Sequence, residues 1–503
     1  MVVALIYDRM RPGMILFSVV VLFLCAGILT PKEMLEGFSN KGMITVALLF
    51  LVSEGIRQSG TLGQVIKKLL PQGKTSVFKA QLRILPSVAF ISAFLNNTPV
   101  VVIFAPIIKH WAKSVNLPAT KFLIPLSYVT ILGGICTLIG TSTNLVVHGM
   151  ILEAGFEGFS MFELGKVGIF IAIAGIIYLF IFSKRLLPDA RPDTAVPDEE
   201  VEEGEKLHRV EAVLGARFPG INKKLSDFNF QRHYGAEVKE IKTRNGQRYV
   251  DHLEDVVLRE GDTLVVMADD TFIPTWGESS VFVLLTNGND PDTSGKKKRW
   301  LALILLVLMI VGATVGELPA TKEMFPDIKL DMFFFVCITT IIMAWTNIFP
   351  ARKYTKYISW DILITIACAF AISKAMVNSG VADCVAGFII GLSDDYGPHV
   401  LLAILFVITN LFTELITNNA AAALAFPLAL SISAQLGVSP TPFFVVICMA
   451  ASASFSTPIG YQTNLIVQGI GNYKFTDFVR IGLPLNIITF LISVILIPLI
   501  WNF

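Results

Sequence analysis

Two pairs of adjacent amide side chains interrupt long apolar runs of this sequence. The first pair is Asn96 and Asn97, and the second is Asn418 and Asn419. A break in an apolar helix exposes backbone N–H and C=O groups that lipid cannot satisfy, so such breaks persist where they line a cavity inside protein. A helix N-terminus carries about half a positive charge and free N–H donors. Two helix starts that face each other would therefore attract an anion.

Local sequence signals predict where these two helices start. Thr98 followed by Pro99 is typical of a hydroxyl N-cap and a proline at the first helical position, where no N–H is needed. Thr417 stands before the second amide pair, and an alanine-rich stretch follows it. We expect the residues of the two tips to bind the anion: Asn96, Asn97, Thr98, Thr417, Asn418 and Asn419.

Two glycine-interrupted segments could hold a cation. Gly140-Thr-Ser-Thr-Asn144 and the stretch from Ser456 to Asn464 offer hydroxyls, amide oxygens and unwound carbonyls, which suit a small alkali cation. No Lys or Arg occurs in residues 84–108, 122–165 or 375–473, so helix dipoles and bound cations must neutralise an anion there. We expect sodium ligands at Asn97, Gly140, Thr143, Asn144, Asn418, Gly460, Thr463 and Asn464.

Other polar residues in apolar segments have simpler interpretations. Glu54, Lys374 and Glu414 are expected to pair with neighbours and to face protein or water, because a lipid-facing charge is costly. All six cysteines lie in apolar segments with no CxxC pair and no His at metal-ligand spacing. They are interpreted as buried hydrophobes, and no transition-metal site is expected.

Composition indicates an all-α polytopic membrane protein. The 503 residues are 54% hydrophobic and 16% charged, and the mean hydropathy is +0.67. The net charge of +1 gives no indication of nucleic acid binding. Residues 85–108 and 399–436 are interpreted as re-entrant hairpins, and residues 62–83 as an amphipathic helix at the interface. Runs of spanning length lie near Met14–Thr30, Met43–Gly60, Phe122–Ile151, Val167–Phe182, Trp300–Val315, Met332–Phe349, Ile362–Val377, Phe443–Ile470 and Ile481–Trp501.

An internal repeat relates the two halves of the chain. Matching residues lie 320 or 321 positions apart, from Ser59-Gly60 and Ser379-Gly380 to Asn144 and Asn464. Each half is expected to hold five spans and one re-entrant hairpin. Because five is odd, the second half should enter from the opposite side, giving an inverted repeat. The loops richer in Lys and Arg should be cytoplasmic. With five spans in each half, most of the first repeat's opening helix is expected to be missing at the N-terminus.

A soluble segment separates the repeats. Residues 236–241 and 262–267 alternate apolar and polar side chains, and turn signals at residues 244–246 and 260–262 separate strands. An acidic linker at residues 198–205 precedes them, and Lys296–Arg299 follows as a basic membrane anchor. We therefore expect a first transmembrane repeat at 1–187, a small α/β cytoplasmic domain at 188–298 and a second transmembrane repeat at 299–503.

At the two tips the chain resembles the divalent anion/sodium symporter (DASS) family, whose hairpin tips carry a Ser-Asn-Thr motif. Asn96-Asn97-Thr98 and Thr417-Asn418-Asn419 stand at these places, and only the central Asn of the motif is kept in both. The resemblance implies sodium co-transport, a homodimer and an elevator motion. The central segment, at His233–Ala236 and Leu258–Asp262, is similar to a TrkA-C (RCK C-terminal) domain. Family members with such insertions are similar to sulfate transporters.

These features together predict a sodium-coupled secondary transporter of a divalent oxyanion, with sulfate as the first choice. A symporter or exchanger of dicarboxylates such as succinate or citrate is the nearest alternative, and a non-transporting membrane sensor is the second. No HExxH, GxSxG or P-loop pattern occurs, so an enzyme is not expected. We expect a multi-pass protein of the inner cell membrane, in contact with lipid, whose cytoplasmic domain binds an unidentified small ligand.

Overall fold

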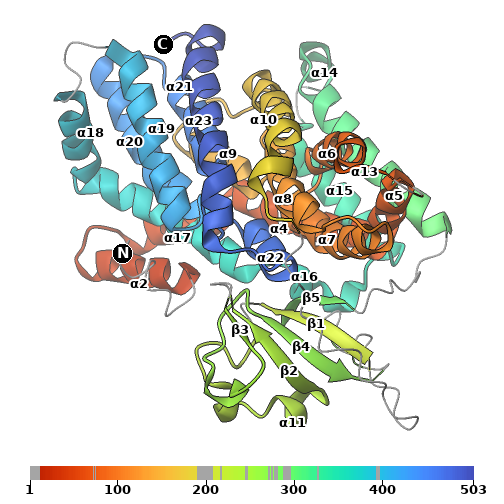
Figure 1. Cartoon of the computed structure of the whole chain (residues 1–503). Helices are drawn as coiled ribbons and strands as arrows, with labels where there is room; N and C mark the ends of the chain where they lie inside the picture. The colour runs from red at the N-terminus through yellow and green to blue at the C-terminus, as the bar shows by residue number, and fades with distance from the viewer. Residues whose placement is uncertain are drawn as a thin grey trace, which may run out of the picture.

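A bundle of helices lies above a five-stranded sheet in the computed structural model (Figure 1). The structure describes residues 12–71, 73, 75–189, 208–215, 218–243, 247–269, 272, 276, 281–286, 296–325, 328–391 and 397–503. The expected acidic linker, the turn at 244–246 and the missing opening helix therefore fall outside the described residues.

The helices form two series in chain order: one precedes the strands of the sheet and the other follows them. The first series runs α2 (Pro12–Cys25), α3 (Pro31–Glu36), α4 (Lys41–Gln58), α5 (Thr61–Leu69), α6 (Val77–Ser92), α7 (Asn97–Ser114), α8 (Thr120–Gly134), α9 (Ser142–Glu153) and α10 (Gly165–Leu186). The second runs α13 (Lys296–Gly316), α14 (Pro319–Met324), α15 (Met332–Trp345), α16 (Tyr354–Tyr357), α17 (Trp360–Asn378), α18 (Val381–Gly391), α19 (Gly397–Leu415), α20 (Asn418–Leu436), α21 (Thr441–Ser452), α22 (Gln462–Gly471) and α23 (Phe475–Ile500).

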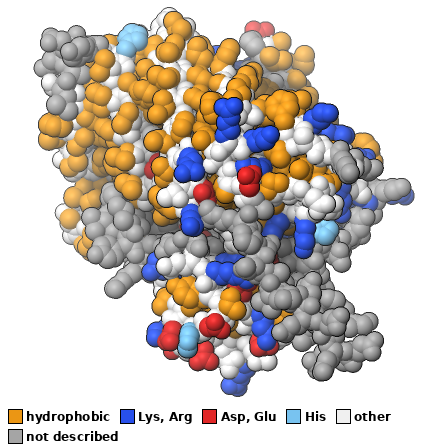
Figure 2. Space-filling view, in the orientation of Figure 1, with side chains coloured by type: hydrophobic (Ala, Val, Ile, Leu, Met, Phe, Trp, Pro, Cys, Tyr) orange, Lys and Arg blue, Asp and Glu red, His pale blue; other side chains and the backbone are white. Residues whose placement is uncertain are grey.

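The surface of the bundle is suited to lipid. Large apolar side chains are exposed on it, including Phe90, Trp345 and Leu499, and hydrophobic side chains cover the upper part of the view in Figure 2. Exposed apolar area of this extent marks contact with a membrane or a partner. Within the described residues, seven helices have the length and composition to span a membrane: Pro31–Gln58, Gly165–Leu186, Lys297–Gly316, Trp360–Asn378, Gly397–Leu415, Asn418–Leu436 and Phe475–Ile500.

Both breaks expected in the apolar runs are present. The chain turns between α6 and α7 at residues 93–96 and between α19 and α20 at residues 416–417. The other two interruptions fall between α8 and α9, at residues 135–141, and between α21 and α22, at residues 453–461. All eight helices joined by these four connections contribute residues to one buried core. In addition, α6 packs against α7 and α19 packs against α20.

Two of the expected boundaries are wrong. Residues 62–83 are not one interfacial helix: α5 ends at Leu69, and Lys79 and Arg83 belong to α6. Within α5 the expected amphipathic pattern holds, since Leu62 and Ile66 are buried while the lysines of its last turn are exposed. The span expected at residues 14–30 ends at Cys25, because Gly27 adopts a left-handed conformation (φ 70°) that terminates α2.

The inserted segment forms an antiparallel sheet in the order β3-β2-β4-β1-β5. The two strands expected from the sequence correspond to β2 and β4, and within the described residues the sheet is accompanied by α11 (Phe230–Tyr234) and short 3-10 turns. Its core is separate from that of the helices and contains aromatic residues such as Phe218 and Phe282. The strands are β1 (His208–Leu214), β2 (Glu237–Lys242), β3 (Arg248–Tyr249), β4 (Thr263–Ala268) and β5 (Phe282–Thr286).

Candidate functional site

The first hairpin tip places Asn97 at the start of α7, almost fully buried with 1% of its surface exposed. Its side-chain amide is fixed at both ends. The Ser92 hydroxyl donates to Asn97 Oδ1 at 2.8 Å, and Asn97 Nδ2 donates to the Tyr461 hydroxyl at 2.8 Å. The amide of the first half therefore reaches the unwound stretch of the second half.

The predicted cap at Thr98 is wrong by two residues. Asn96 is the N-cap of α7 and makes no side-chain capping bond, while Thr98 and Pro99 lie within the first turn. The missing N–H of Pro99 is still tolerated, because the first four N–H groups of a helix have no partner within it. The Thr98 hydroxyl instead points to the second half, where it donates to Gln462 Oε1 at 3.4 Å.

The second tip places Thr417 as the N-cap of α20, at the helix start that the sequence predicted, although its side chain makes no capping bond. Asn418 Oδ1 accepts a bond from the Asn419 backbone N–H at 2.9 Å. Asn419 is buried, and its Oδ1 accepts from the hydroxyls of Ser142 and Thr143, each at 3.3 Å. The second tip therefore contacts the first turn of α9, directly after the unwound stretch of the first half, so that each tip bonds to the broken helix of the opposite half.

Tyr461 joins the two tips and was not predicted as a site residue. Its hydroxyl accepts from Asn97, shares a hydrogen bond of 2.9 Å with Thr141, and interacts with the side chain of Asn418. Thr141 and Tyr461 are themselves 320 residues apart, the same separation that the sequence predicts between equivalent residues of the two halves. Applying that separation to Thr141 would have identified Tyr461 from the sequence, but its packing against the first tip depends on the tertiary fold.

The two broken helices are held open by matching hydrogen bonds. Asn144 Nδ2 donates to the carbonyls of Thr137 at 2.9 Å and Gly134 at 3.5 Å. Asn464 Nδ2 donates to the carbonyls of Thr457 at 3.1 Å and Ser454 at 2.9 Å. These bonds occupy backbone acceptors that the breaks leave without helical partners.

The glycines at the breaks are held in the same way in both halves. The backbone N–H of Gly140 donates to the Thr137 hydroxyl at 3.1 Å, and that of Gly460 donates to the Thr457 hydroxyl at 3.4 Å. Each threonine hydroxyl donates in turn to a backbone carbonyl of the adjacent hairpin, Ala93 in the first half and Glu414 in the second.

Oxygen atoms around Gly134 fit a small alkali cation. A methyl group on Gly134 would lie 2.7 Å from Asn97 Oδ1 and 3.1 Å from the Gly140 carbonyl, so only glycine leaves this space open. Asn144 is fully buried, and its Oδ1 has no hydrogen-bond partner. An unpaired buried oxygen beside other hard oxygens is the chemistry that a sodium ion would satisfy.

In the second half the corresponding oxygen, Asn464 Oδ1, already accepts a hydrogen bond. Ser127 Oγ lies 2.7 Å from Asn464 Oδ1 and 2.9 Å from Thr463 Oγ1. Ser127 comes from α8, so this contact also crosses between the halves. The structure thus brings Asn464 and Thr463 together as expected, with a hydroxyl group in the position that an ion could take.

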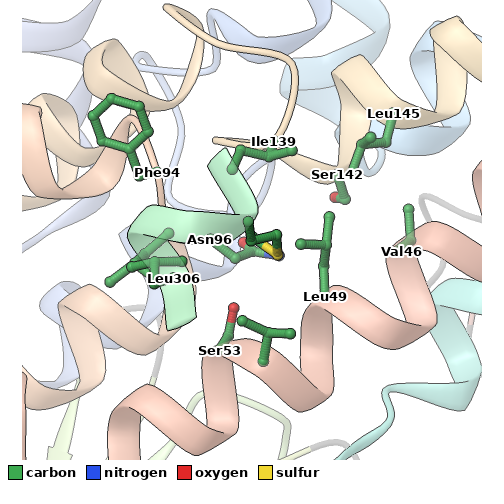
Figure 3. A pocket seen from close by; sticks show the side chains of 12 residues that line it. Val46, Leu49, Ser53, Phe94, Asn96, Ile139, Ser142, Leu145 and Leu306 are labelled. Atoms are coloured by element: carbon green, nitrogen blue, oxygen red, sulfur yellow. The ribbon is translucent and has the colours of Figure 1, made fainter. Parts of the chain in front are cut away.

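Asn96 lies outside this network, in a small pocket. Ser53 of α4 and Ser142 of α9 direct their hydroxyls toward the space beside it (Figure 3). The other lining residues are apolar: Val46, Leu49, Val52, Phe94, Leu95, Ile139, Leu145, Leu306 and Met309. Among the described residues, no group of three or more His, Cys, Asp or Glu side chains could hold a metal ion.

Comparisons with known proteins identify relatives among transporters. The family model for a citrate transporter, CitMHS, matches residues 2–432 and 324–503. An uncharacterized transporter of Synechocystis is 30% identical, over 96% of this chain and 93% of its own length. Sodium/sulfate cotransporter 2 of Chlamydomonas reinhardtii is 30% identical over 56% of this chain and 31% of its own length. A sodium-dependent dicarboxylate transporter of Staphylococcus saprophyticus is 20% identical, over 93% of this chain and 78% of its own length.

Proposed function

The chain belongs to the citrate transporter family, whose members are transporters rather than enzymes, and we propose that it is a sodium-coupled symporter of a divalent oxyanion, most readily sulfate. As a transporter whose described residues include seven apolar helices of spanning length, it is a multi-pass membrane protein. The names of the Chlamydomonas and Staphylococcus relatives support sodium as the coupling ion. The sodium/sulfate cotransporter supports sulfate as the anion.

One observation carries the proposal: each hairpin tip bonds to the broken helix of the opposite half, at or next to the point where its second segment starts. Asn97 bonds to Tyr461, and Asn419 accepts bonds from Ser142 and Thr143. Two helix starts and two helix breaks thus meet in one buried region, and the sequence segments that form them contain no Lys or Arg. The N–H groups of α7 and α20 attract an anion there, and sodium ions supply the remaining positive charge.

We assign the tip residues to the anion and the broken helices to sodium. The anion is held by Asn96, Asn97 and Thr98 of one tip and by Thr417, Asn418 and Asn419 of the other. The buried Thr417 hydroxyl oxygen has no hydrogen-bond partner and is thus open to a ligand. The sodium ions are held by Asn97, Gly140, Thr143, Asn144, Asn418, Gly460, Thr463 and Asn464.

The two halves act as an inverted repeat, with residues 1–187 and 299–503 entering the membrane from opposite sides. The matched bonds of Asn144 and Asn464 support this relation, since their partners are also 320 residues apart. In this proposal the protein is a homodimer. An elevator motion within each subunit exchanges the roles of the two halves and so gives alternating access. Residues 188–298 form a TrkA-C-like domain on the cytoplasmic side that binds a small regulatory ligand.

Uptake by reconstituted vesicles tests the proposal. Labelled sulfate should accumulate in a sodium gradient and not in a potassium gradient of equal size. Asn97→Ala and Asn418→Ala should each abolish this uptake, while Asn378→Ala, which removes an exposed amide at the end of α17, should leave it within twofold. Sodium-independent uptake that survives both tip substitutions would show that the mechanism is wrong.

A dicarboxylate is the second candidate substrate. The name of the Staphylococcus relative and the description of the family model favour it. A dianion with two carboxylates could bridge the same two helix starts, because each carboxylate can accept N–H bonds at a helix N-terminus. Competition of labelled sulfate uptake by thiosulfate, succinate and citrate separates the two candidates, since only true substrates or close analogues should compete.

A further inference from the structure

Glu414, in the last turn of α19, reaches across to the unwound stretch between α21 and α22. Its Oε1 accepts from the backbone N–H of Ser456 at 2.8 Å and from Asn486 Nδ2 at 2.6 Å. Its Oε2 accepts from the backbone N–H of Thr457 at 2.8 Å. The carboxylate therefore replaces the partners that these two N–H groups lose where the helix is broken.

These bonds favour the ionised form of Glu414. Each carboxylate oxygen faces N–H donors, and a protonated carboxyl would direct a further donor toward them. Hydrogen bonds to the charged form of a carboxylate favour that form. Glu414 therefore places an acidic group, held by these donors, within the helical bundle.

No basic side chain of the described residues neutralises this charge. Helix α19 packs against α18, α20, α21 and α23, and α20 and α21 carry no charged residue. On α18, Asp383 accepts a hydrogen bond from Ser431, and on α23 the charged residues are Asp477 and the exposed Arg480. The Tyr128 hydroxyl lies close enough to interact electrostatically with Glu414, but it is neutral and donates to the Phe455 carbonyl. A buried charge without a partner is strongly unfavourable.

An unpaired oxygen lies beside the same carboxylate. Asn486 is 6% exposed, and its Nδ2 donates both to Glu414 and to the Ser456 hydroxyl at 2.8 Å. Its Oδ1 is buried with no hydrogen-bond partner. The Ser454 hydroxyl also lies near, 3.4 Å from Glu414 Oε2. A charge, an unpaired amide oxygen and hydroxyls are the ligands that a hard cation takes.

The first half has no counterpart to this charge. The Thr137 hydroxyl bonds the Ala93 carbonyl as the Thr457 hydroxyl bonds the Glu414 carbonyl, so Ala93 occupies the position of Glu414. Around Gly134 and Asn144 the oxygens belong to neutral groups.

From this difference we propose that the two sodium sites are unequal. Glu414 makes the second-half site negatively charged, so that it binds sodium in the absence of the anion. The neutral first-half site fills when the anion arrives. The inference rests on the proposed sodium-coupled transport and specifies the order in which its ions bind.

Sodium binding to the purified full-length protein, measured with radioactive sodium ions with and without sulfate, tests the order. The wild-type protein should bind one sodium ion per chain without sulfate and more with it. Glu414→Gln should lose the sulfate-independent ion and raise the half-saturating sodium concentration for uptake at least tenfold. Its maximal uptake at saturating sodium should stay within about threefold of wild type. Glu414→Asp, which keeps the charge, should retain sulfate-independent binding.

Two more variants keep the test decisive if Glu414→Gln does not fold. Asn486→Ala removes the unpaired oxygen and should also raise the half-saturating sodium concentration, whereas Asn144→Ala should keep the sulfate-independent ion and lose the sulfate-dependent one. Sulfate-independent sodium binding that is unchanged in both Glu414→Gln and Asn486→Ala overturns the inference while the proposed function stands. A wild-type protein whose uptake ignores sodium overturns both.

Discussion

Asn97 and Asn419 each use one side-chain amide to connect the two halves of the helical bundle. Asn97 donates to Tyr461, and Asn419 accepts from Ser142 and Thr143. Amides can do this because each carries both donors and an acceptor. In the proposed site these same residues would also bind the anion, so a change in one should alter both the affinity for the anion and the packing of the tips.

Replacing Tyr461 by Phe tests the bridge between the tips. The variant loses the hydroxyl that bonds Asn97 and Thr141 but keeps the ring. Each neutral hydrogen bond contributes about 0.5–1.5 kcal/mol, so we expect the half-saturating sulfate concentration to rise about tenfold. Uptake measured over a range of sulfate concentrations checks this. Tyr354→Phe, at an exposed tyrosine, is the matched control, and an equal effect of both variants would argue against the bridge.

Adding a methyl group at Gly134 tests the oxygen cluster. In Gly134→Ala the new carbon would lie 2.7 Å from Asn97 Oδ1, so the amide must move. We expect uptake to fall at least tenfold while the protein remains in the membrane. Gly391→Ala is the control, because a methyl group there meets no atom within 4 Å. Quantifying both variants by immunoblot beside the uptake assay separates loss of function from loss of protein.

The breaks were predictable from the sequence, and the contacts across them were not. Adjacent amides and the repeated Gly-x-x-Thr-Asn pattern locate all four interruptions, because these residues are costly within a lipid-facing helix. Tyr461 and Gln462 could not be chosen in this way, since their role depends on which stretch packs against the first tip. The N-cap predicted at Thr98 is wrong, because α7 starts two residues earlier, after Asn96. At that start the Asn97 side chain bonds to Ser92 and Tyr461, and these tertiary contacts could not be predicted from the local sequence.

At the scale of elements, the turns after α4 and α17 are equivalent. Gly60 follows α4 with φ 70°, and Gly380 follows α17 with φ 71°. Both are preceded by a serine, and the two glycines are 320 residues apart. This left-handed conformation is open to glycine and costs other residues about 1–2 kcal/mol. Two turns of the same geometry at matching positions give each half the same change of direction.

Gly60→Ala and Gly380→Ala should therefore destabilise the protein equally. Each should lower the free energy of unfolding by about 1 kcal/mol, through the strained backbone alone, because a methyl group at either site meets no atom within 4 Å. Denaturant titration in detergent measures this, with Gly391→Ala as a control that has an ordinary helical backbone. Unequal losses from the two glycine variants would contradict the equivalence of the turns.

At the scale of the whole molecule, the sheet domain is docked on the helices that carry the candidate site. Lys109 of α7 forms an ion pair of 3.0 Å with Glu211 of β1. Gly261 packs against Leu465 of α22, and a side chain at Gly469 would meet Thr263 of β4. Both α7 and α22 begin at the site, next to Asn97 and Tyr461. A shift of the sheet domain is thus mechanically linked to the two helix starts.

A disulfide between Thr263→Cys and Gly469→Cys tests this docking. A Cβ atom on Gly469 would lie 3.9 Å from Cβ of Thr263, within the range of about 3.5–4.5 Å that disulfides span. A protease site inserted after Asp290 would separate the two cysteines. After oxidation and cleavage, the fragments of the double variant should stay joined on a non-reducing gel, and those of each single variant should separate. Separation of the oxidised double variant would mean that the two surfaces do not meet.

Transport by the crosslinked protein then shows whether the sheet domain moves with the site. Because its contacts are with α7 and α22, the domain should be carried along when these helices move, and the bond to α22 should not obstruct them. We expect the oxidised double variant to retain sulfate uptake within about twofold of its reduced form. Uptake that stops on oxidation and returns with reductant would instead mean that the domain must release α22 during each transport cycle, so that docking of the domain inhibits transport.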